Sequence, residues 1–241
     1  MVNDQIKNGN YRMYYEFRPQ DSRPQQLEKC VIPWFAERLT GHTTVRMLDI
    51  GCNSGKLTNA VLTIVRKALP GKCCTMLGVD IDEQLITVAR EQHQSVGLHF
   101  ESTDIYEAAN GTRQLDPIGA ALEQAGSQRF EVIFCFSILM YVHLNHGDDG
   151  LRSVLNYLCG RAEFLVLELQ SWKKYRDHVR RMHREGGGDY PSYGELTWKG
   201  NDGQLEKFIS DYVTQQGFSI VDSSAEKNEF NRNIICFVRN S

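Results

Sequence analysis

"VRMLDIGCNSGKLT", residues 45–58, is an apolar run that closes on Asp49 and Ile50 and then turns on two glycines. The run predicts a buried strand, and the apolar spacing that follows predicts a helix. Gly51 and Gly55 have no Cβ, so the backbone can turn sharply here and a ligand can approach it closely. Taken alone, such a turn could also be only a tight connection between a strand and a helix.

The rest of the chain repeats this strand-then-helix pattern. Near-continuous apolar runs predict strands at 45–50, 74–81, 98–102, 130–136 and 163–169. Apolar residues three and four apart predict helices at 56–69, 82–96, 115–126 and 147–159. A helix at about 204–216 and two strands at 218–224 and 233–239 complete the chain. We therefore expect an α/β fold, with a mostly parallel seven-stranded sheet, an antiparallel C-terminal hairpin and helices on both faces.

Composition restricts the class of protein. The chain has 241 residues, of which 41% are hydrophobic and 24% charged, so we expect one globular domain over 1–241. The net charge of −3 gives no global attraction to nucleic acid or membrane, so any such attraction has to be local. The apolar runs are too short to cross a bilayer, and the polar N-terminus lacks a signal-peptide core. We expect a cytoplasmic protein, possibly also nuclear.

Seven cysteines include no C-x-x-C pair, so we expect buried reduced thiols and no metal site.

Acidic residues at the ends of the next two strands suggest a bound nucleoside. Asp80 closes "GVDID" about 30 residues after the glycine turn, where a carboxylate can accept hydrogen bonds from both ribose hydroxyls. The turn "GCNSGK" departs from the G-x-G-x-x-G pattern of dinucleotide folds. The chain resembles instead the class I S-adenosylmethionine methyltransferases. That resemblance implies that Asp104 bonds the adenine amino group and that Phe136 packs on the adenine, although each could also be a helix cap or a core residue. The implied cofactor-binding set is Asp49, Gly51, Asn53, Gly55, Asp80, Asp104, Ile105 and Phe136.

A more specific resemblance begins after the fourth strand. The stretches "FCFSILMYVHLNHGDDGL" (134–151) and "LELQSWKKYR" (167–176) are similar to the bicoid-interacting family of RNA 5′-phosphate methyltransferases. "GNYRMYYEFRPQDSR" (9–23) and "FNRNIICF" (230–237) resemble the N-terminal segment and closing strand of that family. Tyr141 stands where the family has Trp, and Leu169 and Ser171 replace two prolines, which removes a backbone constraint. The matching positions are Ser137, His143, Leu144, Asn145, Gly147, Asp148, Gly150, Leu151, Glu168, Gln170, Trp172 and Tyr175.

This resemblance implies roles around the methyl acceptor. Arg23 would pair with the carboxylate of the cofactor, while Tyr14 and Arg18 of the N-terminal segment 1–26 would reach the RNA phosphate; Arg18 could instead be a solvated surface charge. His143 and Asn145 could donate to the phosphate or could order the loop around them. Gln170 would lie beside the crevice, and Trp172 would stack on a terminal base or cover the core.

A basic run follows directly, within a predicted insertion over 171–200. "SWKKYRDHVRRMHR" (171–184) is either a solvated helix face or a surface for the RNA backbone, and its place at the crevice favours the second interpretation. Lys173 is expected to make a second phosphate contact. The segment 185–196 is expected to be mobile and to act as a lid on RNA. The other expected RNA-binding residues of the run are Lys174, Arg176, Arg180 and Arg181.

The chemistry implied by the family needs little general base catalysis. A phosphate oxygen is already anionic near pH 7, with a second pKa of about 6, so the enzyme mainly has to position it and balance its charge. The preferred substrate is the 5′-monophosphate of a small structured RNA of the tRNA or microRNA-precursor type. Alternatives are methyl capping of a 5′-triphosphate small nuclear RNA, a small-molecule methyltransferase, and a non-catalytic RNA-binding protein. We expect a monomer that binds neither DNA nor membrane.

Overall fold

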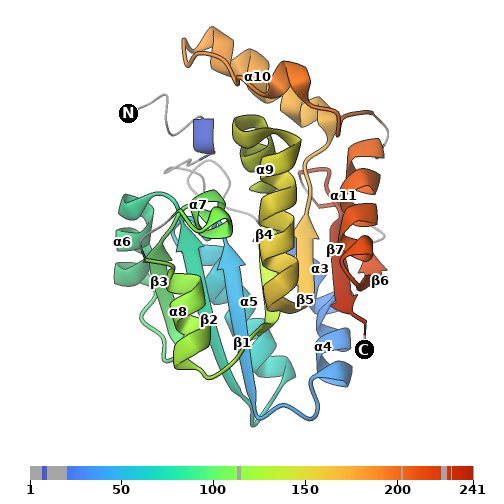
Figure 1. Ribbon diagram of the computed structural model, residues 1–241. Helices are drawn as coiled ribbons and strands as arrows, with labels where there is room; N and C mark the ends of the chain where they lie inside the picture. The colour runs from blue at the N-terminus through green and yellow to red at the C-terminus, as the bar shows by residue number, and fades with distance from the viewer. Residues whose placement is uncertain are drawn as a thin grey trace.

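A seven-stranded sheet forms the centre of the computed structural model (Figure 1), which describes residues 7–9, 21–112, 115–201, 203–223, 227–228 and 230–240. The strand order is β3-β2-β1-β4-β5-β7-β6. Strands β1 to β5 run parallel, whereas β7 is antiparallel to both β5 and β6. The predicted sheet and its C-terminal hairpin are confirmed. The strands are β1 (Thr44–Ile50), β2 (Cys73–Asp80), β3 (Leu98–Ser102), β4 (Phe130–Phe136), β5 (Ala162–Glu168), β6 (Phe218–Ser223) and β7 (Ile234–Arg239).

Helices cover both faces of the sheet, because alternate residues of the buried strands point to opposite sides (Figure 1). In β1, Met47 packs into one core cluster and Leu48 into the other. One face carries α3 (Arg23–Cys30), α4 (Ile32–Arg38), α5 (Lys56–Ala68) and α6 (Glu83–Gln92). The other carries α7 (Ile105–Asn110), α8 (Pro117–Gln124), α9 (Leu139–Arg161) and α11 (Gln204–Gln215). Residues of α10 (Trp172–Arg184) and of a short 3₁₀ turn, η1 (Tyr193–Glu195), pack against the same core cluster.

Helix α9 begins earlier than the sequence pattern predicts. It starts at Leu139, eight residues before the predicted start, and is broken at Gly147, where φ is 70° and ψ is −172°. The part of α9 before Gly147 is stabilised by packing on the core, in which Leu139 and Leu144 are almost fully buried. Only the part after Gly147 had been predicted as a helix, and the part before it brings several polar residues to the carboxyl end of the sheet.

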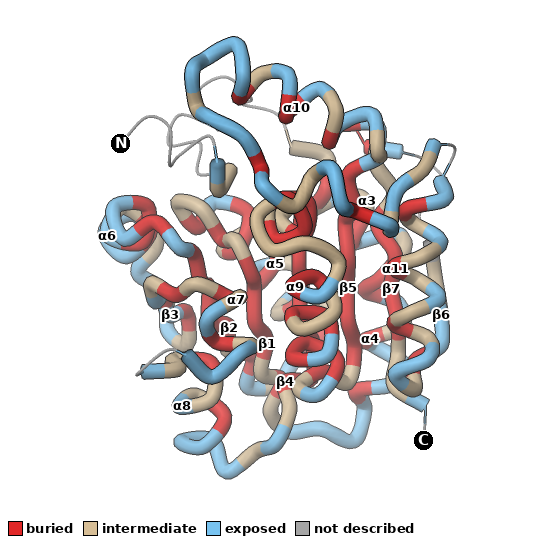
Figure 2. The backbone as a smooth tube through the Cα atoms, turned by 45° about the horizontal axis from the view of Figure 1, so that its top comes forward, coloured by how far each residue is buried: buried red, intermediate tan, exposed pale blue. Residues whose placement is uncertain are grey.

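Helix α10 lies across the carboxyl ends of the parallel strands, as Figures 1 and 2 both show. Its buried residues are Tyr175, His178, Val179 and Met182, so one side packs on the domain while the other is open to solvent. Within the described residues, no helix is long and apolar enough to cross a membrane.

Candidate active site

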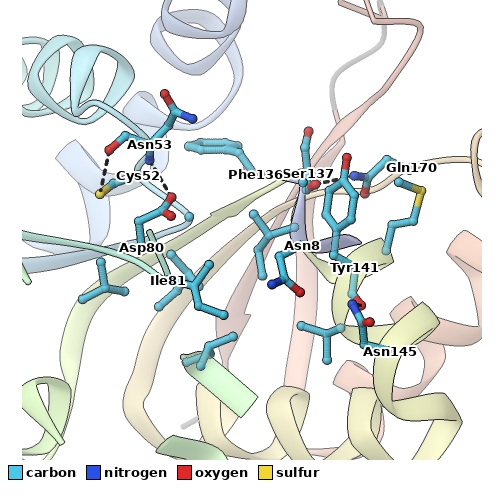
Figure 3. Close-up of a pocket in the computed structure, with 18 of the residues that line it drawn as sticks. Asn8, Cys52, Asn53, Asp80, Ile81, Phe136, Ser137, Tyr141, Asn145 and Gln170 are labelled. Carbon is cyan, nitrogen blue, oxygen red and sulfur yellow. Dashed lines mark hydrogen bonds between the residues drawn. The ribbon is translucent and has the colours of Figure 1, made fainter. Parts of the chain in front are cut away.

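A cavity of about 900 Å³ opens beyond the carboxyl ends of β1, β2 and β4, below α10. Its volume is in the range of sites that enclose a cofactor-sized ligand. Figure 3 shows Cys52, Asn53 and Asp80 on one side of it, and Ser137, Tyr141 and Gln170 on the other. The predicted site residues that line the cavity are Arg23, Asp49, Gly51, Asn53, Asp80, Asp104, Ile105, Phe136, Asn145, Gln170, Lys174 and Arg181.

The glycine turn forms one wall of the cavity. Gly51 and Gly55 have φ values of 78°, and Asn53 between them has φ 51°. A Cβ on Gly51 would overlap the side chain of Ile138, so the close approach of the β4 end requires glycine there. Gly55 is not in the cavity wall. A Cβ at that position would lie 2.6 Å from Phe100 Cζ, so Gly55 serves the packing and the start of α5.

Two buried acids lie beneath this turn. Asp80 accepts hydrogen bonds from the backbone N–H groups of Asn53 (2.9 Å) and Asp82 (3.0 Å), which fixes its orientation while each oxygen keeps a lone pair for a ribose hydroxyl. Burial raises the pKa of Asp80 despite these bonds. Asp49 accepts a hydrogen bond from Thr58 Oγ1 at 2.6 Å, and burial raises its pKa to about 6.

A stacked pair of rings lies next to Asp104. The rings of Tyr106 and His146 stack with centroids 3.5 Å apart, and Asp104 caps α7 by accepting from the Tyr106 N–H at 2.8 Å. Both rings line the cavity. Phe136, expected to pack on adenine, also lines the cavity, with its ring centroid 5.8 Å from Arg23 Cζ, and its contact with adenine stays a prediction. Tyr106 and His146 add an aromatic surface beside Asp104 that the sequence pattern did not predict.

A cluster of charges closes the other end of the cavity. Glu168 is fully buried and lies 3.8 Å from Arg23 Nη1 and 3.5 Å from Arg232 Nη1. Arg23 also donates to both oxygens of Asp21, at 2.8 and 2.6 Å. Ser137, with φ 64°, places its hydroxyl between Glu168 and Arg232. Arg232 lines the cavity and was missed in the sequence, although it lies within the closing-strand motif 230–237.

The cavity wall fits S-adenosylmethionine. Asp80 and the Tyr106–His146 stack suit the ribose and the adenine, and the left-handed turn lets a ligand approach the backbone. Gln170 adds a buried amide whose Oε1 has no hydrogen-bond partner among the described residues.

Helix α10 presents a polar face to the cavity. Lys174, Asp177, His178 and Arg181 line it, spaced as residues on one side of a helix. The expected phosphate contact Lys173 is exposed and outside the cavity wall, and the structure places Lys174 there instead. Two residues expected to bind RNA also lie outside the cavity wall. Arg176 Nη2 lies 3.5 Å from Asn201 Oδ1, and Arg180 is exposed.

His143 does not face the cavity, which corrects its expected contact with phosphate. Its side chain is fully buried, with Nε2 2.6 Å from Asp148 Oδ1 and Nδ1 3.2 Å from the Tyr175 hydroxyl. Burial lowers the pKa of His143, which favours the neutral ring; because a carboxylate only accepts, Nε2–H is the donor to Asp148 and Nδ1 of the neutral ring can accept from Tyr175. Although burial opposes it, hydrogen bonding from His143 and Thr197 lowers the pKa of Asp148 to about 2. His143 therefore anchors α10 and the 197–198 segment.

Asn145 lines the cavity and also connects two backbone segments through hydrogen bonds. Its Nδ2 donates to the carbonyls of Tyr141 (2.8 Å) and Lys7 (3.1 Å). The same Lys7 carbonyl accepts from the Tyr190 hydroxyl at 3.0 Å, and Tyr190 lies 2.7 Å from His178 Nε2. Residues 7–9 are thereby tied to α9 and to the segment 185–196 at the cavity mouth. In this structure Tyr190 is buried, which anchors the predicted lid at that point.

Trp172 covers the core rather than the cavity. Its ring stacks on Tyr193, with centroids 5.6 Å apart, and packs against Tyr175 at 5.2 Å. This arrangement agrees with the expectation that Trp172 covers the core and not with stacking on a terminal base. The two expected phosphate contacts of the N-terminal segment, Tyr14 and Arg18, lie outside the described residues.

Comparison with known proteins gives two family matches and several similar chains. Residues 130–239 match the family described as Bicoid-interacting protein 3 (Bin3), and residues 48–163 match the family described as a methyltransferase domain. A "Pre-miRNA 5′-monophosphate methyltransferase" of Danio rerio is 32% identical over 203 residues, which cover 80% of this chain and 78% of the relative. The Xenopus laevis protein of the same name is 28% identical and covers 95% and 91%. The "RNA 5′-monophosphate methyltransferase" of Homo sapiens is 31% identical and covers 80% and 68%.

Solved structures support the fold at low sequence identity. The N-methyltransferase NodS from Bradyrhizobium japonicum WM9, in complex with S-adenosyl-L-homocysteine, superposes with a TM-score of 0.56 at 14% identity, covering 100% of this chain and 97% of that one. The CMeT domain of the citrinin polyketide synthase gives a TM-score of 0.59 at 16% identity, covering 99% and 59%. Both likenesses concern the fold alone.

Proposed function

Because the chain belongs to the Bicoid-interacting protein 3 family of S-adenosylmethionine-dependent RNA 5′-phosphate methyltransferases, we propose that its substrate is the 5′-monophosphate end of a small structured RNA. The observation that carries this proposal is the cationic side of the cofactor cavity. Lys174 and Arg181 reach the cavity from α10, which lies over its mouth. The names of the relatives, pre-miRNA and RNA 5′-monophosphate methyltransferase, support the same substrate class.

The cofactor supplies an electrophilic methyl group, and the protein has to bring one phosphate oxygen in line with it. Lys174 and Arg181 would balance the phosphate charge and help to position the attacking oxygen. A phosphate monoester is largely dianionic at pH 7.5, so the nucleophile needs no strong base. His143 is engaged in the anchor of α10, which agrees with a reaction that depends on positioning.

The outer side of α10 would hold the RNA beyond its 5′ end. Lys173, Arg180 and Arg184 are exposed there, outside the cavity wall. Such charges bind the phosphate backbone without reading its sequence, and the binding weakens with salt. The expected cytoplasmic location and monomeric state remain predictions.

The test is transfer of a radiolabelled methyl group to one hairpin RNA carrying a 5′-hydroxyl, a 5′-monophosphate or a 5′-triphosphate. Label on the monophosphate alone is expected. Label on the triphosphate alone would identify a capping-type enzyme, and label on none of them, with cofactor binding intact, would refute the proposal for this RNA. Lys174→Ala should lower kcat/KM about tenfold or more, whereas Lys67→Ala, which changes an exposed lysine of α5 outside the cavity wall, should change it about twofold or less.

A further inference from the structure

Residues 7–9 form part of the wall of the cofactor cavity. Asn8 and Gly9 line the cavity, and Figure 3 shows Asn8 on the side of Tyr141 and Asn145. Gly9 has φ 74°, and a Cβ there would overlap the Tyr141 ring, so the chain passes directly against that ring. A ligand that enters or leaves the cavity therefore meets this short segment.

The segment that follows α10 is docked mainly through Tyr190. Within 183–195, a stretch that the structure describes throughout, Tyr190 is the one buried residue. Gly186 and Gly188 precede it with φ values of 68° and 80°, and a Cβ at either position would meet no atom within 4 Å. These glycines serve the backbone conformation and not close packing. The docking of this segment thus depends on Tyr190 and on the Tyr193 ring that stacks on Trp172.

The Tyr190 hydroxyl joins this segment to residues 7–9 and to α10. It donates to the Lys7 carbonyl at 3.0 Å and lies 2.7 Å from His178 Nε2. A carbonyl only accepts and a phenol has one proton, so Tyr190 uses its proton on Lys7 and accepts from His178 Nε2–H. The Lys7 carbonyl also accepts from Asn145 Nδ2 at 3.1 Å, which connects the same junction to α9.

We propose that Tyr190 is a positioning residue that makes residues 7–9 and 185–196 open and close together at the cavity mouth. Movement of residues 7–9 breaks the bond that Tyr190 donates, and movement of 185–196 withdraws the hydroxyl from both of its partners. Tyr190 lies outside the cavity wall, so it acts through Lys7 and His178 and does not touch the ligand. Since this inference concerns passage of the cofactor, it holds whichever RNA end is methylated.

Such a gate affects rates more than affinity. Because its contacts are formed in the free protein, they slow both the entry and the exit of the cofactor. Loss of the gate should therefore raise the association and dissociation rate constants together and leave Kd nearly unchanged. A residue that only supports the bound cofactor would instead raise the dissociation rate constant and Kd.

Tyr190→Phe tests this prediction, because it keeps the buried ring and removes the hydroxyl. Surface plasmon resonance with S-adenosylhomocysteine as the analyte should give rate constants that are both about tenfold higher, with Kd within about threefold of the wild type. The retained Kd also shows that the variant is folded. Tyr212→Phe is the matched control, since it removes a hydroxyl that donates to Asn156 Oδ1 outside the cavity wall; it should change each rate constant about twofold or less.

Trypsin cleavage after Lys7 monitors residues 7–9 independently of the cofactor. The Lys7 carbonyl belongs to the peptide bond that trypsin would cut, and it is the group that Tyr190 and Asn145 hold. In Tyr190→Phe, loss of residues 1–7, followed by intact mass, should be about fivefold faster or more, while cleavage elsewhere in the chain keeps its wild-type rate.

Four outcomes would overturn the inference. Unchanged rate constants in Tyr190→Phe would show that the hydroxyl does not limit passage of the cofactor. A higher dissociation rate constant alone would make Tyr190 a support of the bound cofactor. Faster passage of the cofactor without faster cleavage after Lys7 would show that the two segments move separately. A parallel increase in cleavage across the whole chain would show a general loss of stability.

Discussion

The buried carboxylate of Asp49 allows a stability prediction with a defined sign. Burial, increased by the nearby charge of Asp80, raises its pKa from 3.8 to about 6, while the Thr58 hydrogen bond and the charge of Arg23 work in the opposite direction. A pKa that is higher in the folded state favours the neutral form there. The associated stability is therefore complete below the unfolded pKa and is lost as the pH rises through about 6. A shift of about two units corresponds to about 3 kcal/mol.

Asp49→Asn removes the charge and keeps an acceptor for Thr58. The variant should be more stable than the wild type at pH 7.5, by up to about 3 kcal/mol, and at pH 4.5 by only about 1 kcal/mol, because the folded wild type is then already largely protonated. Urea denaturation of the cofactor-free protein at the two pH values measures both differences. Asp149→Asn, which alters an exposed acid, is the control and should stay within about 0.5 kcal/mol.

An Asp49→Asn variant that is no more stable than the wild type at pH 7.5, or whose advantage in stability does not shrink at pH 4.5, would refute this reasoning.

The buried charge of Asp49 lowers the stability of the wild type but should also contribute to cofactor binding, because Asp49 lines the cofactor cavity. Its charge should favour the cationic sulfonium of S-adenosylmethionine over the neutral thioether of S-adenosylhomocysteine. The variant should therefore lose affinity for the first ligand more than for the second, as measured by calorimetry.

Three further changes test other parts of the site. Gly51→Ala places a Cβ against Ile138 at φ 78° and should cost about 1–3 kcal/mol in urea denaturation and abolish measurable cofactor binding by calorimetry. Tyr175→Phe removes the hydroxyl that lies 3.2 Å from His143 Nδ1; it should cost about 1 kcal/mol and raise KM for RNA while leaving the cofactor Kd unchanged, whereas a changed Kd would place this anchor in the cofactor site. Lys174→Ala should lower the salt dependence of RNA binding by about one unit of slope in a filter-binding titration, and an unchanged slope would remove Lys174 from the phosphate contacts.

The sheet and the turn could be predicted because their signals are local. The apolar runs mark strands that are covered on both faces, and Gly51 and Asp80 follow strand ends that meet at one edge of a parallel sheet. His143 shows where this reasoning was incomplete. Its position after β4 suggested a phosphate contact, yet it lies four residues after Leu139 on the buried side of α9. The helical spacing was present in the sequence, and the break at Gly147 concealed it.

Helix α10 shows why the choice between neighbouring lysines needed the structure. Tyr175, Val179 and Met182 form its buried stripe, and Lys174, His178 and Arg181 form a second stripe displaced by one residue. Successive residues on a helix differ by about 100° in direction, so Lys174 points into the cavity while Lys173 points to solvent. The choice depends on how the helix is rotated on the domain, and the Tyr175–His143–Asp148 contacts fix that rotation. The buried side of α10 therefore positions the charges that the proposed reaction requires.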